Sequence, residues 1–164
     1  MPLIYETADL ADVRANARRF VEEVVTPQAP AWEIQGMVPR QVLLQMGELG
    51  FFSLRVPEDL GGLGMGPLAS AILAEELGRS TYGGFAATVL VHTDLAMPYP
   101  LNHASHEQKR RWFPQMLTGE TISAIAITEP DAGSDVAGIK TFAGRDGDGW
   151  RVSGSKMFIT NGVQ

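Results

Sequence analysis

The sequence predicts an α+β fold: an all-α N-terminal domain, then the opening strands of an antiparallel β-barrel-like domain. Through the first two-thirds of the 164 residues, apolar side chains recur at three- and four-residue steps. From Ile122 onward, alternating and β-branched runs replace that pattern. We therefore expect a helical domain over residues 1–120 and the beginning of a β domain, incomplete, over residues 121–164.

The first expected helix carries one apolar stripe, formed by Leu10, Val13, Ala17, Phe20, Val21 and Val24. Thr7 or Asp9 could cap its start, because both side chains can accept a hydrogen bond from a free N–H of the first turn. Pro27 is expected to stop it, since proline lacks the N–H that a helix interior needs.

Further helices follow the same signals. One is expected to open at Pro39 and to close at Gly50, and another opens at Pro67 after a glycine-rich loop. Residues 84–95 are apolar nearly all round and predict a buried helix. The capping-box pattern 105–108, Ser-His-Glu-Gln, predicts a short helix through Trp112, which Pro114 kinks or ends.

Three stretches predict strands. Residues 122–128, ISAIAIT, alternate and are β-branched, and KTFAGR and WRVSG flank a DGDG turn signal. Residues 155–160, SKMFIT, form the third candidate. So few strands leave faces and edges uncovered, so we expect this chain to be the front portion of a longer polypeptide.

Composition argues against several classes of protein. The formal net charge of −6 disfavours non-specific nucleic-acid binding, and the absence of cysteine removes disulfides, thiolate metal sites and cysteine nucleophiles. No window approaches the roughly 18–20 consecutive apolar residues of a membrane span. The N-terminus lacks the apolar core of a signal peptide, so we expect a cytoplasmic protein.

Two other patterns are weak. Gly62, Gly64 and Gly66 invite comparison with a dinucleotide loop, but no buried strand precedes them and their spacing is wrong, so a helix–helix connection is expected. His103 and His106 are three residues apart without a convincing acidic partner, and we expect no metal site.

The stretch AITEPDAGSD, residues 126–135, is the first candidate site. A strand would present the Thr128 hydroxyl at its end, and beyond Pro130 the backbone must turn, with Gly133 free to adopt a positive φ. Bent N–H groups beside the Ser134 hydroxyl suit phosphate oxygens. The alternative is a plain turn. In either case the acids are expected to bond their own backbone: Glu129, Asp131 and Asp135.

The stretch 155–160 extends this site. In a strand, Phe158 and Thr160 would share one face, where an aromatic plane beside a hydroxyl suits a flat ring with polar edges. The alternative is a simple cross-strand pair in a core. The flat-ring interpretation requires that Thr128 and Phe158 face one cleft.

The run 126–138, AITEPDAGSDVAG, resembles the signature of the FAD-dependent acyl-CoA dehydrogenases. Supporting stretches occur in the expected order: GGLGMG, ILAEELGR, HTDLAMPYPLNHASHEQKRRWFPQMLTGE and GSKMFITNG. HTDLAMPY is most similar to the long-chain-like branch. The resemblance implies a truncated acyl-CoA dehydrogenase fold, with the helical domain and the first strands of the central β domain. Asp131 stands where glycine is common.

The resemblance implies FAD as cofactor and assigns its contacts by position. Ile125 and Ile127 would lie along the flavin, and Thr128 would bond its pyrimidine edge. Gly133 and Ser134 would meet the pyrophosphate, and Ser134 would also contact the CoA portion of the substrate. Phe158, Ile159 and Thr160 would lie at the isoalloxazine, with the Thr160 hydroxyl near N5.

The implied reaction is α,β-dehydrogenation of an acyl-CoA to the trans-2-enoyl-CoA, as in fatty acid metabolism. The family's catalytic base is a glutamate of the C-terminal bundle, so no catalytic residue is assigned in this chain. An electron-transferring flavoprotein would accept the electrons. When full length, the protein would form a homo-oligomer, a tetramer or dimer.

Two alternatives stay open at this point. An acyl-CoA oxidase, or another flavin enzyme of the superfamily, would keep the fold and change the electron acceptor. A non-catalytic, truncated binding module would need a partner to cover its exposed β edges.

Overall fold

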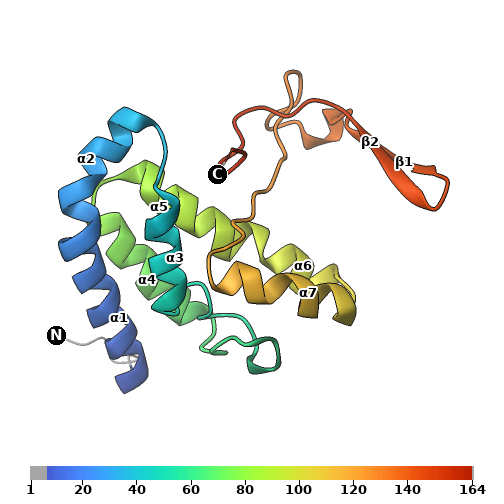
Figure 1. Ribbon diagram of the computed structural model, residues 1–164. Helices are drawn as coiled ribbons and strands as arrows, with labels where there is room; N and C mark the ends of the chain where they lie inside the picture. The colour runs from blue at the N-terminus through green and yellow to red at the C-terminus, as the bar shows by residue number, and fades with distance from the viewer. Residues whose placement is uncertain (1–6, 164) are drawn as a thin grey trace.

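The computed structural model describes residues 7–163, so residues 1–6, examined above for a signal peptide, and residue 164 lie outside the described part. A helical body leads through an extended chain to a two-stranded hairpin, which confirms the predicted α+β class (Figure 1). The elements are α1 (Ala8–Phe20), η1 (Val21–Val25), α2 (Thr26–Gln35), α3 (Arg40–Glu48), η2 (Glu58–Leu60), α4 (Pro67–Arg79), α5 (Gly83–Leu90), η3 (Val91–Ala96), α6 (Pro98–His103), α7 (His106–Leu117), η4 (Val136–Gly138), β1 (Phe142–Asp146) and β2 (Gly149–Ser153).

Side-chain caps begin two helices. The Thr7 hydroxyl accepts a hydrogen bond from the Leu10 N–H at 3.4 Å, so Thr7 rather than Asp9 caps α1. At α7 the predicted capping box is complete, because the Ser105 hydroxyl accepts from the Gln108 N–H and the Gln108 side chain accepts from the Ser105 N–H. These bonds use N–H groups that the first turn of a helix leaves free.

Several prolines, Pro27 and Pro114 among them, lie where the helical chain continues. The prediction that Pro27 stops the first helix is wrong, and the helix that contains Pro114 extends to Leu117. Before Pro27 the chain forms the π-helical turn η1, in which the Thr26 N–H bonds to the Val21 carbonyl five residues back. This wider turn relieves the clash that a proline ring makes with the carbonyl four residues earlier in a regular α-helix.

The hydrophobic core lies between the helices of the body, where α1 packs along α4. Within the described residues no helix is both long and apolar enough to cross a membrane. The expected helix at residues 84–95 corresponds to α5 and the π-helical turn η3. The largest fully buried apolar side chains are Phe52, Phe113, Leu43, Met46, Leu73 and Leu77.

One ion cluster joins α1 to α4. The fully buried carboxylate of Glu76 accepts hydrogen bonds from Arg14 at 2.8 Å and Arg18 at 2.7 Å, and Arg79 lies 3.3 Å away. Burial by itself raises the pKa of Glu76, but the bonds from Arg18 and Arg14 outweigh it and hold the pKa below its ordinary value. Glu76 therefore stays ionised inside the helical body.

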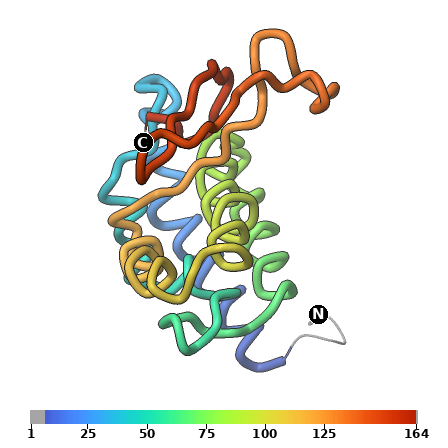
Figure 2. The backbone as a smooth tube through the Cα atoms, turned by 90° about the vertical axis from the view of Figure 1, so that its right-hand side faces the viewer, coloured from blue at the N-terminus to red at the C-terminus, as the bar shows by residue number. Residues whose placement is uncertain are grey.

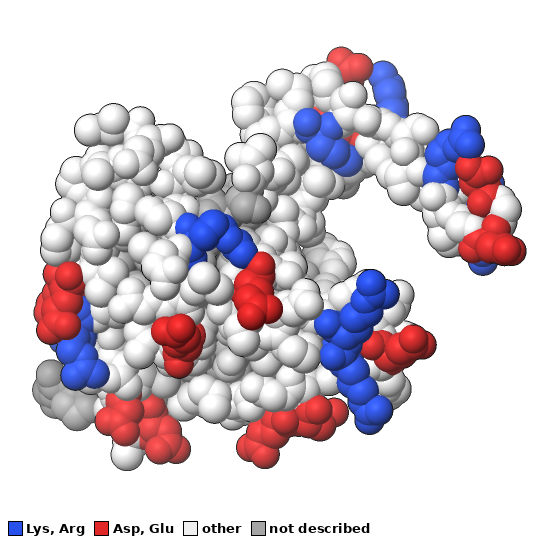
Figure 3. Space-filling model, in the orientation of Figure 1, with Lys and Arg blue, Asp and Glu red and all other residues white. Residues whose placement is uncertain are grey.

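The hairpin prediction is confirmed, and the other two strand predictions are wrong. β1 pairs antiparallel with β2, from Phe142 opposite Ser153 to Asp146 opposite Gly149. Residues 122–128 and 155–160 belong to no strand of the described chain. The hairpin projects from the helical body as an arm with mixed charges along it (Figure 3).

We predict that Glu76→Gln lowers the free energy of unfolding by about 3 kcal/mol, because it removes the buried negative charge that Arg14, Arg18 and Arg79 share. Urea titration at pH 7 measures the change. The adjacent Glu75 is the matched control: its side chain is 58% exposed, so Glu75→Gln should change stability by less than about 0.5 kcal/mol. Equal losses in the two variants would contradict a special role for the buried carboxylate.

Candidate functional site

The candidate site lies where residues 122–128, here called the connecting segment, leave the helical body. Residues 154–163, here called the C-terminal segment, run next to the connecting segment (Figure 2). The Met157 N–H donates to the Thr128 carbonyl at 2.9 Å, and the Lys156 ammonium donates to the Ile127 carbonyl at 2.8 Å. The two segments thus lie side by side, although neither is a strand.

His92 holds the start of the connecting segment. Its Nδ1 accepts the Ser123 N–H at 3.0 Å, which assigns the ring proton to Nε2, and Nε2 donates to the Met116 carbonyl at 3.0 Å. Burial lowers the pKa of His92 to about 4, although the bond to Met116 opposes that shift, and the charge of Arg40 lowers the pKa further. The imidazole is therefore neutral near pH 7.

Asn161 ties the C-terminal segment to the same place. Its Nδ2 donates to the Thr88 carbonyl at 2.9 Å and to the Ser123 carbonyl at 3.1 Å. Its backbone φ of 65° lies in the left-handed region, which asparagine tolerates better than most residues. Its Oδ1 is buried and has no hydrogen-bond partner among the described residues.

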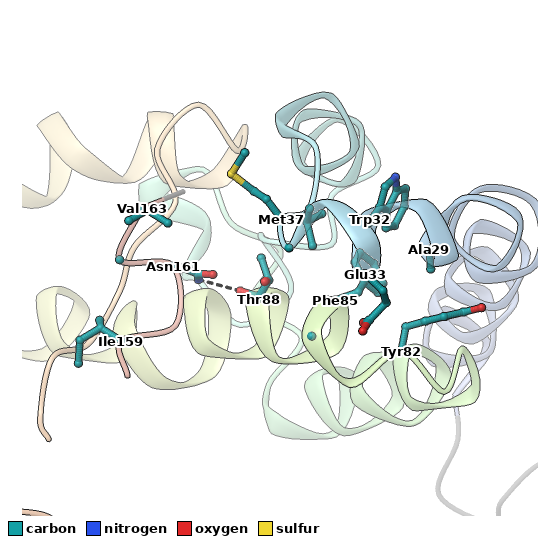
Figure 4. Close-up of a pocket in the computed structure, with 14 residues that line it drawn as sticks. Ala29, Trp32, Glu33, Met37, Tyr82, Phe85, Thr88, Ile159, Asn161 and Val163 are labelled. Atoms are coloured by element: carbon teal, nitrogen blue, oxygen red, sulfur yellow. Dashed lines mark hydrogen bonds between the residues drawn. The ribbon is translucent and has the colours of Figure 1, made fainter. Parts of the chain in front are cut away.

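Two cavities flank this junction. One, of about 330 Å³, lies between α2, α5 and the C-terminal segment, and its lining includes Trp32, Phe85 and Ile159 (Figure 4). The other is a groove of about 480 Å³ along the connecting segment, lined by Ile125 and Ile127 together with residues of η3, α6 and α7. Both cavities have mainly apolar walls with a few polar groups, as small-molecule sites commonly do.

Glu129 organises the turn after the connecting segment. Its carboxylate is buried and accepts the N–H groups of Lys140 at 2.7 Å and Thr141 at 2.9 Å, and it pairs with Lys156 at 2.9 Å. Hydrogen bonding from Thr141, then from Lys140 and Lys156, lowers the pKa of Glu129 to about 2. The prediction that Glu129 bonds its own local backbone is wrong, because its carboxylate reaches eleven and twelve residues along the chain.

The signature turn is present, but its glycine behaves differently from expectation. Glu129 and Ala132 exchange backbone hydrogen bonds at 2.8 and 3.2 Å, so the chain reverses directly after Thr128. Gly133 is not among the residues of positive φ, contrary to the sequence expectation. Gly133 and Ser134 are both exposed, and a Cβ added to Gly133 would meet nothing within 4 Å.

Phe158 and Thr160 do not share the face of a strand, because the segment that carries them forms no strand. Phe158 instead has a φ of 56° and is 88% exposed, and Thr160 is also exposed. A left-handed backbone is uncommon for a bulky residue and costs roughly 1–2 kcal/mol. The prediction that Phe158 and Thr160 share a strand face is therefore wrong, and neither Thr128 nor Phe158 lines either of the two cavities described above. The backbone bond between Thr128 and Met157 still keeps the two predicted site segments together.

The glycine-rich loop is a connection, as the sequence predicted. Its N–H groups bond within the body: Leu63 donates to the Ser53 carbonyl and Gly64 to the Val56 carbonyl. Within the described residues no cluster of three or more His, Asp or Glu side chains could hold a metal ion. Three further site residues were not predictable from sequence, because a single polar residue in an apolar or turn sequence carries no periodic signal: His92, Asn161 and Lys156.

We predict that Glu129→Gln releases the Lys140 and Thr141 N–H groups, because an amide offers one acceptor oxygen in place of two. Amide hydrogen exchange should show their protection factors falling by about tenfold or more. Asp131→Asn is the control, since Asp131 is exposed and bonds only the Lys140 ammonium among the described contacts. Unchanged protection in Glu129→Gln would contradict the assigned role.

We predict that acid weakens the fold through His92. The unfolded chain binds more protons between the ordinary pKa of 6.5 and the folded pKa of about 4. The free energy of unfolding should therefore fall as pH drops through this window, by up to about 3 kcal/mol. Urea titrations at pH 7, 5 and 4 measure it. His92→Gln should flatten the dependence, whereas the exposed His103→Gln should keep it; parallel curves for both variants would refute the assignment.

Two family descriptions match the chain in order. "Acyl-CoA dehydrogenase, N-terminal domain" matches residues 7–120, and "Acyl-CoA dehydrogenase, middle domain" matches residues 124–164. The second match includes the Glu129 turn and all of the connecting segment except residues 122 and 123.

Individual proteins agree with these matches. The long-chain specific acyl-CoA dehydrogenase, mitochondrial, of Sus scrofa is 42% identical over 151 residues, which are 91% of this chain and 34% of that protein. The solved acyl-CoA dehydrogenase of Geobacillus kaustophilus has a TM-score of 0.91 and 40% identity, covering 99% of this chain and 42% of its own. A Mycobacterium smegmatis glutaryl-CoA dehydrogenase, solved in complex with FADH2, has a TM-score of 0.88 and 33% identity. The match covers 95% of this chain and 40% of that one.

The chain thus spans about a third of the length of the curated relative and less than half of either solved chain. The helical domain match alone covers residues 7–120, more than half of the sequence. The helical body, the connecting segment and the signature turn together identify the chain as a member of the acyl-CoA dehydrogenase family.

Proposed function

We propose that this chain forms the N-terminal, flavin-contacting part of an enzyme that oxidises an acyl-CoA to its trans-2-enoyl-CoA. One observation carries the proposal: Phe158 presents an exposed ring from a left-handed position, next to a residue bonded to the Thr128 carbonyl. Strained, exposed aromatic residues on anchored segments are typical of ligand sites. Family membership supplies the chemistry of that ligand.

The residues present fit FAD. The exposed ring of Phe158 offers a stacking surface for a flat heterocycle, and the hydroxyls of Thr128 and Thr160 offer hydrogen bonds to its polar edges. Ile125 and Ile127 supply the apolar wall of the groove. The buried Asn161 Oδ1, which lacks a partner among the described residues, is an acceptor beside the neighbouring cavity.

The exposed turn that contains Gly133 and Ser134 would bind phosphate. Gly133 offers room for close approach, and Ser134 offers a hydroxyl and an N–H, so these two residues would meet the FAD pyrophosphate. Ser134 would also contact the CoA part of the substrate. Asp131 pairs with Lys140 at 3.1 Å, which offsets one of the negative charges near this turn.

Bound FAD would supply the acceptor for the hydride that leaves Cβ of the substrate. A base must take the α-proton, and the two glutamates buried within the described residues are poorly suited to that task. Glu76 is held by arginines, and Glu129 has a pKa near 2 and three donors. We assign no catalytic residue to this chain, because the family resemblance implies a base in the C-terminal bundle, outside the residues of this sequence.

The same proposal includes the partners. An electron-transferring flavoprotein would reoxidise the flavin, and the protein would act as a homo-oligomer, a dimer or tetramer. We keep the sequence expectation of a cytoplasmic location as part of the proposal, and cell fractionation checks it; the relative from Sus scrofa is named as mitochondrial.

The test uses the protein as its gene encodes it. We predict flavin absorbance in the purified protein and bleaching of that absorbance when an acyl-CoA is added without oxygen. Failure to take up FAD would refute the proposal. Bleaching followed by rapid peroxide release, without an electron-transferring flavoprotein, would instead identify the acyl-CoA oxidase alternative.

Two exposed phenylalanines make a matched pair for this test. Phe158→Ala should weaken FAD binding by about tenfold, the value of one aromatic stacking contact of about 1–1.5 kcal/mol. Phe142 is 68% exposed but lies on the hairpin arm, so Phe142→Ala should leave FAD binding unchanged. Equal effects would remove Phe158 from the proposed site.

A further inference from the structure

The connecting segment reaches its place without strand pairing, so other contacts must fix its backbone. At its far end, Ile127 and Thr128 bond to the C-terminal segment through Lys156 and Met157. At its near end, the Ser123 N–H and the Ser123 carbonyl each bond to a side chain, His92 and Asn161 respectively. These near-end bonds decide where the segment leaves the helical body.

The near-end bonds form one continuous relay. The Met116 carbonyl accepts from His92 Nε2, His92 Nδ1 accepts from the Ser123 N–H, and the Ser123 carbonyl accepts from Asn161 Nδ2. Asn161 then donates to the Thr88 carbonyl of α5. The relay joins α7, η3, the connecting segment, the C-terminal segment and α5 through the fully buried His92 and the half-buried Asn161.

The imidazole is held in a single orientation. His92 is fully buried, and the ring of Phe52 packs edge-on against it at 4.8 Å and 86°. The histidine lies on the π-helical turn η3, where the Met97 N–H bonds back to its carbonyl at 3.0 Å. Single π-helical turns occur frequently at functional sites, where they redirect one side chain out of the helical register.

We propose that His92 is a positioning residue that sets the spacing between the two segments carrying the proposed flavin contacts. The inference rests on the proposed function for the identity of the ligand. Through Ser123, His92 fixes Ile125 and Ile127 on one segment; through Ser123 and Asn161 it fixes Ile159 and Thr160 on the other. His92 itself touches none of the proposed ligand-contacting residues in the described hydrogen bonds.

Two amide substitutions separate the two bonds of the ring. The Nδ1 atom lies two bonds from Cβ, as do the amide oxygen and nitrogen of asparagine, so His92→Asn can keep the acceptor toward Ser123. The Nε2 atom lies three bonds from Cβ, as in glutamine, so His92→Gln can keep the donor toward Met116 and loses the acceptor. If His92 is a positioning residue, His92→Asn should preserve the spacing of the two segments and His92→Gln should not.

The first measurement is amide exchange in the flavin-free protein. His92→Gln should lower protection at Ser123 and at residues 159–162 together by about tenfold, whereas His92→Asn should stay within about threefold of wild type. Ser80→Ala is the control, because it removes a buried hydroxyl bond of 2.7 Å to Leu77 at the end of α4, outside the relay. Loss of protection in only one of the two segments would overturn the proposal.

The second measurement is the affinity for FAD and the flavin absorption maximum. His92→Gln should weaken FAD binding by about tenfold and shift the maximum, His92→Asn should do neither, and Ser80→Ala should lower thermal stability alone. Equal behaviour of the two His92 variants overturns the positioning role. If wild-type protein takes up no FAD, the proposed function fails, while the exchange comparison still decides whether His92 couples the two segments.

Discussion

The structure around the site depends on one constraint: where a backbone without a strand partner is shielded from water, its polar groups need other hydrogen-bond partners. An N–H or carbonyl left unpaired away from water costs on the order of 1–3 kcal/mol. Between residues 122 and 141, His92, Asn161, Lys156 and Glu129 supply those bonds to the connecting segment and to the start of the hairpin. These four side chains thus supply hydrogen bonds that neighbouring strands supply in a β-sheet.

The connecting segment needs a neutral side chain at its start and a charged one just after its end. Glu129 must be ionised to accept two N–H groups and the Lys156 ammonium, whereas His92 must be neutral to accept the Ser123 N–H. The pKa shifts follow from these demands: hydrogen bonds favour the charged carboxylate, and burial disfavours the charged imidazole. Both groups hold these states near neutral pH, so the turn and the exit from the helical body are fixed together.

Periodic features of the fold were predictable from sequence, and single contacts were not. Caps, apolar stripes and the Gly147-containing turn are local, so the helix starts and the hairpin were found. Alternation at residues 122–128 and 155–160 reports two different faces but not a hydrogen-bonding partner, and both strand predictions were wrong. Pro27 was read as a stop because a π-helical turn has no sequence signature. The adjacency of the two site segments was found, although its anchors were not.

The exposed aromatic side chains of the β part differ in what holds them. On the hairpin, Trp150 lies under the Arg145 guanidinium at 4.5 Å, and Phe142 lies in a regular strand. Phe158 has a left-handed backbone and an 88% exposed ring, yet the preceding residue, Met157, is bonded to the Thr128 carbonyl. A strained conformation persists only where its surroundings determine it. On its other side, three residues along the chain, Asn161 bonds to the Thr88 and Ser123 carbonyls, so Phe158 stands between two anchored positions.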